Sequence, residues 1–211
     1  MGDVSRFTKL VRRAAFAYSA RSRRRKSDMI LKFLAQHHVD SVLLVGATGD
    51  EYAGNPLQPH TGIIERRVAA HYPIKMGINV VPAVTPYPFM VADVRAMPFA
   101  DEFVDFALAN AVIEHVGGIR DQQRMVDEMT RVARSWVITT PNKWFPVEAH
   151  SHAVFLHWFP GWRRRCNERR AAANLSQFDL LSLRQFRRMM PAGTKIVGKP
   201  WSPTFTAIYN A

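Results

Sequence analysis

The chain has 211 residues, of which 47% are hydrophobic and 22% charged, a composition that is typical of a globular protein and excludes wholesale disorder. No apolar run approaches the roughly 18 to 20 residues of a membrane-spanning helix, and the single cysteine, Cys166, excludes an internal disulfide. The excess of 29 lysines and arginines over 17 acids gives a net charge of +12, which points to an anionic partner.

Hydrophobic periodicity predicts helices and strands that alternate along the chain. In chain order, we expect helices at residues 7–20, 27–34, 62–71, 120–134, 163–173 and 182–190. We expect strands at residues 41–45, 78–84, 89–92, 104–109, 136–140, 195–197 and 204–209. Residues 50–61 are rich in Gly, Pro, Asn and Gln and predict a loop. This alternation is typical of an α/β fold with a mostly parallel sheet.

The first predicted strand ends in a short loop formed by Gly46, Ala47, Thr48 and Gly49. Ligands of open α/β sheets bind beyond the carboxyl ends of the strands, and glycine lets the backbone approach a ligand closely. A tight turn without a ligand explains the same glycines equally well. A dinucleotide-binding loop needs a further glycine three residues on, where this chain has Tyr52, so hydride transfer is disfavoured.

Two later segments carry a more specific pattern. Residues 92–105 read ADVRAMPFADEFVD, and residues 110–116 read NAVIEHV. They resemble class I S-adenosylmethionine-dependent methyltransferases, and most closely the group of small-molecule and lipid-quinone methylases. The resemblance covers about residues 40–140. It implies a Rossmann-like, seven-stranded, mostly parallel sheet with an antiparallel last strand and helices on both faces.

The resemblance also implies S-adenosyl-L-methionine as the cofactor and assigns residues to it. The loop from Gly46 to Gly49 would line the methionine end of the cofactor. Asp93 and the backbone of Val94 would meet the adenine, and Asn110 would lie beside the cofactor at the end of the fourth strand. An exposed acid that merely ends a strand is the alternative interpretation of Asp93.

Three positions depart from the family pattern. Leu44 replaces an acid in the first strand, Thr48 replaces the second glycine of the loop, and residues 80–85 contain no acid to bind the ribose hydroxyls. Losing a charged contact of that kind would cost roughly 2–3 kcal/mol of binding free energy. A catalytically degenerate, methyltransferase-like binding or scaffold protein is therefore the alternative function.

Methyl transfer is an in-line displacement that depends mainly on alignment, and a base is needed only for a poorly nucleophilic acceptor. His115 is the candidate base, although it could instead orient its loop. Candidate residues that face the acceptor lie after the fifth predicted strand: Trp144, Glu148, His150 and His152. We expect no metal site, because the chain has no H-E-x-x-H helix and Pro146 interrupts this segment.

Most of the excess positive charge lies in two patches. Residues 1–30 carry nine Lys or Arg against two acids, and residues 160–190 carry eight against two. An aromatic stretch precedes the second patch, so an anionic lipid surface or a lipid-linked acceptor fits this region. A nucleic-acid methylase or binder, and a merely solvated basic face, are the alternatives.

The sequence also suggests how the chain is organised. We expect residues 1–26 to form a basic helical extension and residues 27–211 to form the methyltransferase-like domain. An aromatic and arginine-rich insertion is expected at about residues 142–175. The first 20 residues lack the apolar core of a secretion signal, so a cytoplasmic location with peripheral membrane contact is expected.

Overall fold

The computed structural model describes residue 18 and residues 21–49, 62–148, 150–151 and 153–211. Nearly all of the helix expected at 7–20 and the whole loop expected at 50–61 lie outside these residues. Among the residues described, no helix is both long and apolar enough to cross a membrane.

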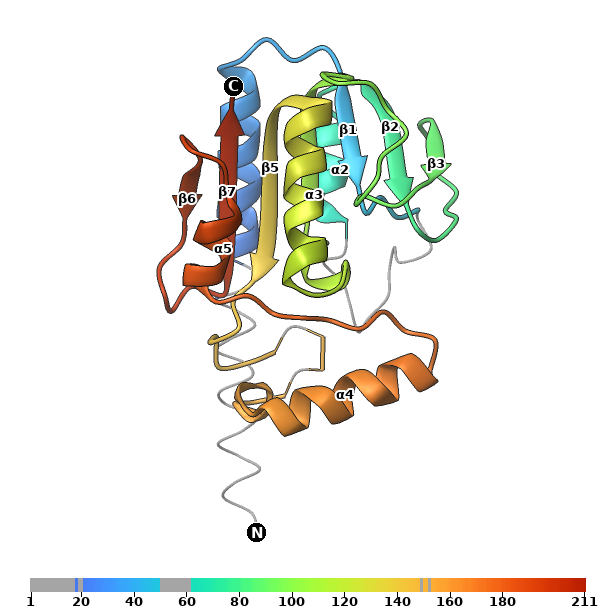
Figure 1. Ribbon diagram of the computed structural model, residues 1–211. Coiled ribbons are helices and arrows are strands. Elements are labelled where there is room, and N and C mark those ends of the chain that lie inside the picture. Colours follow the sequence, from blue (N-terminus) through green and yellow to red (C-terminus); the bar gives the residue numbers. More distant parts are fainter. Residues whose placement is uncertain (1–17, 19–20, 50–61, 149, 152) are drawn as a thin grey trace.

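Seven strands form one sheet in the order β3-β2-β1-β4-β5-β7-β6 (Figure 1). The strands are β1 (Val42–Val45), β2 (Ile74–Asn79), β3 (Phe89–Val91), β4 (Val104–Asn110), β5 (Ala133–Pro141), β6 (Lys195–Val197) and β7 (Thr204–Asn210). β1 to β5 run parallel to one another, whereas β7 runs antiparallel to its neighbours β5 and β6. The predicted α/β class and the antiparallel last strand are therefore confirmed.

Helices cover both faces of this sheet (Figure 1). The described helices are residues 21–35, α2 (Ile63–Ala69), α3 (Ile119–Val132), α4 (Pro160–Ala172) and α5 (Leu183–Met189), and the 3-10 turns are η2 (Ile113–His115) and η3 (Leu156–Trp158). α4 differs from the others because it lies beyond the carboxyl edge of the parallel strands and buries none of its residues.

The central strand β1 shows how the two helical layers are held, because successive residues of a strand point to opposite faces. Leu43 and Val45 belong to the cluster that contains α3 and α5, whereas Val42 and Leu44 belong to the cluster that contains residues 21–35 and α2. All four residues are buried. The strand is apolar throughout because both of its faces are covered.

The second strand was predicted in the wrong place. β2 is Ile74–Asn79, whereas the apolar run had suggested residues 78–84. Beyond Asn79 the chain leaves the sheet, and Val80, Val81 and Val84 are all more than 60% exposed. Apolar character therefore misled the prediction at this point, since these valines do not pack into the core.

Two residues that interrupt the apolar pattern of β2 have structural roles of their own. Lys75 donates a hydrogen bond from Nζ to the carbonyl oxygen of Phe103 at 2.7 Å. Gly77 leaves room for the ring of Tyr87, which would lie 2.7 Å from a Cβ at that position. Both contacts depend on tertiary structure, so the sequence pattern could not show them.

The helix expected to begin at Ser27 instead continues through that residue and includes residues 21–35. Ser27 is buried, and its hydroxyl accepts a hydrogen bond from Arg67 of α2 at 2.9 Å, so it joins two helices and caps neither. The helix also crosses the expected boundary between residues 1–26 and residues 27–211. This domain division stays a prediction.

The same helix buries a lysine. Lys26 is 7% exposed, and burial together with the nearby Arg23 lowers its pKa to about 8, although the charges of Glu65 and Glu114 oppose this change. Burial disfavours the charged form of a lysine. Lys26 therefore destabilises the folded chain at neutral pH relative to an apolar residue of similar shape.

Side chains of α3 bind the turn at residues 97–101, which lies in the segment that resembles the methyltransferase family. Arg131 donates to the carbonyl oxygens of Met97 at 3.0 Å and Phe99 at 2.7 Å, while the Glu128 carboxylate accepts from the Met97 N–H at 2.6 Å. Arg131 also pairs with Glu128 at 2.7 Å. The turn at residues 97–101 is thus fixed by charge-assisted hydrogen bonds, which are stronger than neutral ones.

We predict that Lys26→Met removes a rise in the free energy of unfolding between pH 8 and pH 10.5. Because the folded pKa lies below 10.5, the unfolded chain binds more protons in this interval, so stability increases with pH. The difference between the folded and unfolded pKa values corresponds to a rise of roughly 3 kcal/mol in the free energy of unfolding. Urea denaturation across this pH range measures it, with the exposed Lys32→Met as control. An unchanged rise in Lys26→Met would contradict the prediction.

We predict that Arg131→Met lowers the free energy of unfolding by about 2–3 kcal/mol, because two carbonyl oxygens and the Glu128 carboxylate lose their donor. Arg120→Met, an exposed substitution on the same helix, should change it by less than about 0.5 kcal/mol. Chemical denaturation compares the two variants. Equal effects would show that the contacts of Arg131 do not stabilise the turn.

Candidate active site

The carboxyl edge of the parallel strands brings four polar or glycine residues into one row. The register of β1 with β2 and β4 aligns the ends of these three strands. Gly46 follows β1, Asn79 ends β2 and Asn110 ends β4, while Asp93 lies just beyond β3. Ligands of open α/β sheets bind at this edge, outside the carboxyl ends of the strands.

Gly46 has a structural requirement of its own. Its φ is +72°, and a Cβ there would lie 2.4 Å from Cγ2 of Val112. Its N–H donates to the carbonyl oxygen of Ile78 at 2.8 Å, which joins the loop to β2. The tight turn therefore requires glycine here whether or not a ligand binds. The other predicted loop residues follow directly: Ala47, Thr48 and Gly49.

Asp93 already has a partner within the protein. Arg95 donates to its carboxylate from the backbone N–H at 2.9 Å and from the guanidinium at 2.6 Å, and these hydrogen bonds hold the pKa of Asp93 below its usual value. Its side chain is nevertheless 39% exposed, so it can accept a further hydrogen bond. Val94, predicted beside it, is buried.

Asn110 is held by two side chains. Its Nδ2 donates to Oε1 of Glu65 at 2.9 Å, and its Oδ1 accepts from the hydroxyl of Thr139 at 2.7 Å. The second carboxylate oxygen of Glu65 is buried and has no hydrogen-bond partner among the described residues. The sequence analysis missed Glu65, although an acid in the first turn of the helix after β1 would have been a usable signal.

Asn79 was also missed, because the second strand was predicted too late in the chain. It ends β2, where the family pattern requires an acid. Its Nδ2 donates to the carbonyl oxygen of Ala47 at 3.0 Å, so it supports the loop after β1. The predicted absence of an acid at this strand end is correct, but a polar amide takes its place.

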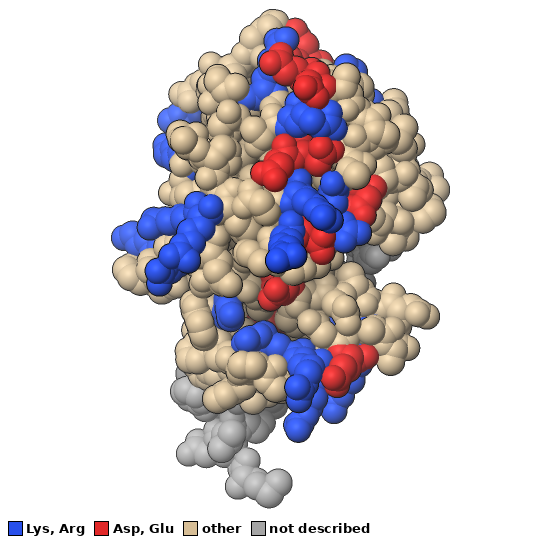
Figure 2. All heavy atoms as spheres, viewed as in Figure 1, with Lys and Arg blue, Asp and Glu red and all other residues tan. Residues whose placement is uncertain are grey.

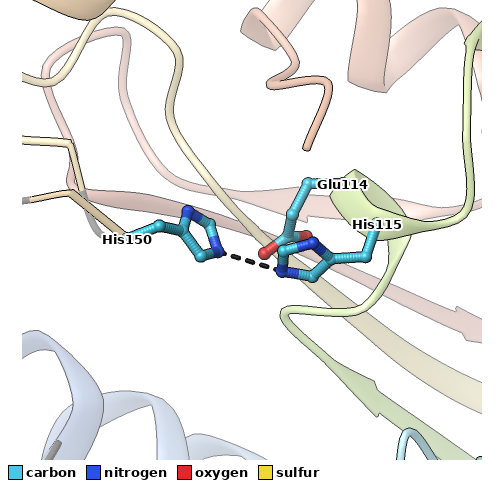
Figure 3. Close-up of side chains that lie close together, drawn as sticks. All are labelled: Glu114, His115 and His150. Atoms are coloured by element: carbon cyan, nitrogen blue, oxygen red, sulfur yellow. Dashed lines mark hydrogen bonds between the residues drawn. The ribbon is translucent and has the colours of Figure 1, made fainter. Parts of the chain in front are cut away.

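Two predicted histidines from distant segments meet at this edge. His115 in η2 and His150 lie with their Nε2 atoms 3.0 Å apart (Figure 3). Burial lowers the pKa of His115. Its Nδ1 contacts the carbonyl oxygen of Gln177 at 2.7 Å, so both of its ring nitrogens have partners. The catalytic role of His115 stays a prediction.

The remaining acceptor-side candidates lie in different environments. The Glu148 side chain is fully buried and contacts Nδ1 of His150 at 2.6 Å. Burial alone would raise its pKa, but hydrogen bonds from His150 and Ser151 outweigh burial and lower the pKa to about 2. Trp144 is 48% exposed, and His152 lies outside the described residues. Their roles toward an acceptor stay predictions.

Comparison with known proteins identifies this edge as part of a methyltransferase domain. Residues 72–136 match the family model described as a methyltransferase domain. This match runs from just before β2 into β5, and it includes Asn79, Asp93 and Asn110. No curated protein matches the sequence.

Solved structures from three organisms share the fold. A protein of Pyrococcus horikoshii OT3 is 11% identical, with 90% of this chain and 91% of that chain covered and a TM-score of 0.56. The N-methyltransferase NodS from Bradyrhizobium japonicum WM9, in complex with S-adenosyl-L-homocysteine, is 12% identical, with coverages of 88% and 85% and a TM-score of 0.53. A SAM-dependent methyltransferase from Methanosarcina mazei is 12% identical, with coverages of 85% and 94% and a TM-score of 0.50.

At these identities the structural likeness shows the fold alone. The match to the methyltransferase domain covers residues 72–136. This segment contains three of the four residues of the row. Residues 72–136 thus match a methyltransferase domain, and the seven-stranded sheet has the Rossmann-like fold of the solved methyltransferase structures.

Proposed function

We propose that this chain transfers a methyl group from S-adenosylmethionine to a small or lipid-linked acceptor. The observation that carries the proposal is the row of Gly46, Asn79, Asp93 and Asn110 at the carboxyl edge of a methyltransferase domain. When bound, the cofactor supplies an electrophilic methyl group. The protein then has to align the acceptor and exclude water.

The residues of this edge fit the cofactor. The half-exposed carboxylate of Asp93 has room to accept from the adenine amino group while Arg95 stays bound. The unpartnered Oε2 of Glu65 is buried and acidic, so it suits the ammonium group of the cofactor. A buried oxygen without a donor is unfavourable in the free protein, and a cationic ligand would relieve this.

Asn79 would replace the ribose-binding acid of the family. An amide can donate to one hydroxyl and accept from another, but it carries no charge. Hydrogen bonds to a charged group are about twice as strong as neutral ones. The cofactor is therefore expected to bind, with lower affinity than in relatives that keep the acid.

The acceptor would approach from the side of His115. A hydroxyl acceptor needs a base, whereas an amine in its neutral form does not. We keep His115 as the candidate base. Because its Nε2 faces His150, it can accept a proton from an acceptor only when that contact opens.

A lipid-linked acceptor is supported by the surface around α4. Figure 2 shows Lys and Arg side chains gathered over α4 and, separately, over α5. Apolar side chains near the start of α4 are 48 to 62% exposed: Trp144, Leu156 and Phe159. Exposed apolar groups beside arginines are typical of a segment that lies on an anionic membrane surface.

A non-catalytic scaffold is the second candidate, and a specific observation favours it. Leu44 is fully buried in the core, so no acid can be supplied from that position of β1. Asp93 and Asn110 also make hydrogen bonds within the protein that need no ligand. These two side chains are therefore held in place without a cofactor, as a scaffold would require.

We predict that S-adenosyl-L-homocysteine binds with a micromolar Kd and that Asp93→Ala weakens binding at least tenfold. The lost hydrogen bond to a charged group is worth about 1.5–3 kcal/mol. Isothermal titration calorimetry measures both values. Asp40→Ala, which removes an exposed acid elsewhere, should leave the affinity unchanged. An absence of binding at millimolar ligand would favour the scaffold.

We predict that the chain sediments with anionic vesicles but not with phosphatidylcholine vesicles. Replacing three exposed α4 arginines by glutamine should weaken this binding at least tenfold, because each contributes about 1 kcal/mol near an anionic surface. The substituted residues are Arg164, Arg165 and Arg169.

The matched control removes the same charge from α5. Its three exposed arginines, Arg184, Arg187 and Arg188, are replaced by glutamine in the same way. If both triple variants lose equal affinity, net charge alone drives the binding, and α4 is not the membrane-facing surface.

A further inference from the structure

The contact between His115 and His150 leaves two nitrogen lone pairs facing one another. The carbonyl oxygen of Gln177 can only accept, so Nδ1 of His115 carries a proton. The carboxylate of Glu148 likewise accepts from Nδ1 of His150 at 2.6 Å. In neutral imidazoles both Nε2 atoms are then acceptors, and they lie 3.0 Å apart. A cation must lie between them: a proton or a metal ion.

A third group completes the cluster. A carboxylate oxygen of Glu114 lies within 4.8 Å of the ligand nitrogens of His115 and His150. Figure 3 shows Glu114 beside His115, with His150 directed toward them from the opposite segment. Glu114 is fully buried, and its Oε1 has no hydrogen-bond partner among the described residues. A shared proton explains the histidine contact but leaves this oxygen unpartnered.

We propose that Glu114, His115 and His150 bind a divalent transition-metal ion. Two nitrogen ligands at about 2.1 Å from one ion, at an angle of 90 to 110°, lie about 3.0–3.4 Å apart. The observed 3.0 Å between the Nε2 atoms meets this requirement. Two ligands of one ion lie at most about 4.2 Å apart, and the three groups, all within 4.8 Å of one another, are close to this spacing.

The groups around the three ligands support the assignment. A metal-bound histidine usually donates its other ring N–H to a carboxylate or a backbone carbonyl, which fixes its orientation. His150 meets this condition through Glu148, and His115 through Gln177. The hydroxyl of Thr140 donates to Oε2 of Glu114 at 3.1 Å, which leaves Oε1 free for an ion.

The donor set also limits the kind of metal. Two imidazoles and one carboxylate suit Zn²⁺ and its neighbours in the first transition row, whereas Mg²⁺ prefers oxygen ligands. The sequence analysis expected no metal because it searched for a local helical motif. His115 and His150 are 35 residues apart in sequence, and only the tertiary structure shows that they meet.

This inference goes beyond the proposed methyl transfer and does not require it. The ligands lie after β4 and β5, and none of them is among the residues assigned to the cofactor. Metal binding can therefore be measured without cofactor or acceptor. Failure of metal binding leaves the methyl-transfer proposal intact, whereas a metal ion on Nε2 of His115 would exclude this residue as the base.

The experiment titrates the chelator-treated full-length chain with Co²⁺, whose visible absorption reports its ligands, and with Zn²⁺ in competition. We expect one equivalent of each metal to bind and millimolar Mg²⁺ not to displace it. His115→Ala, His150→Ala and Glu114→Gln should each weaken Co²⁺ binding at least 100-fold. Glu148→Gln, which removes the charge that supports His150 but none of the three ligands, should weaken it 10- to 100-fold.

His38→Ala is the matched control, since this histidine has a side chain that is 91% exposed and lies outside the cluster. It should leave Co²⁺ affinity unchanged. Circular dichroism checks that each variant is folded, and His150→Asn replaces His150→Ala if the latter is not. An absence of Co²⁺ and Zn²⁺ binding at 100 μM free metal, or equal affinity in the native chain and a folded His150 variant, would overturn the proposal in favour of a shared proton.

Discussion

A buried carboxylate at the carboxyl end of β4 constrains this whole edge of the sheet. Glu114 is fully buried, and burying a charge is unfavourable unless hydrogen bonds and opposite charge compensate for it. Thr140 of β5 donates to it, and the charge of the buried Lys26 acts on it. Its backbone carbonyl accepts from the N–H of Asp179 at 2.7 Å. One residue thus joins the first described helix, β5 and the segment after α4.

Most of the fold could be predicted because burial on both faces makes the central strands apolar throughout. The predicted strands at residues 41–45 and 136–140, with apolar residues at 42–45 and 136–138, therefore correspond to β1 and β5. β2 could not be placed in this way, since Lys75 and Gly77 fit through tertiary contacts and the apolar Val80 is exposed. A hydrophobic pattern therefore predicts a strand correctly only where the apolar residues of the run are the buried ones.

The candidate site was predicted less completely, and the reason is physical. Asp93 and Asn110 were assigned through the resemblance of residues 92–116 to the methyltransferase family, and each ends or follows a strand. Glu65 contacts Asn110, which is 45 residues away in sequence, and Asn79 was missed because of the error in β2. The pairing of His115 depends on a loop that folds back across the edge. Contacts between distant segments leave no periodic pattern in the sequence, so only the tertiary structure shows them.

The position of α4 depends on the same polar contacts. α4 buries no residue fully, and none of its residues belongs to an apolar core cluster. Asn167 of α4 instead bonds to the backbone of Phe178, in the segment whose Gln177 carbonyl contacts His115. The ring of Phe178 stacks on His150 with centroids 4.9 Å apart. An ion or acceptor that fixes the two histidines would therefore also fix the basic helix through which the chain would meet an anionic surface.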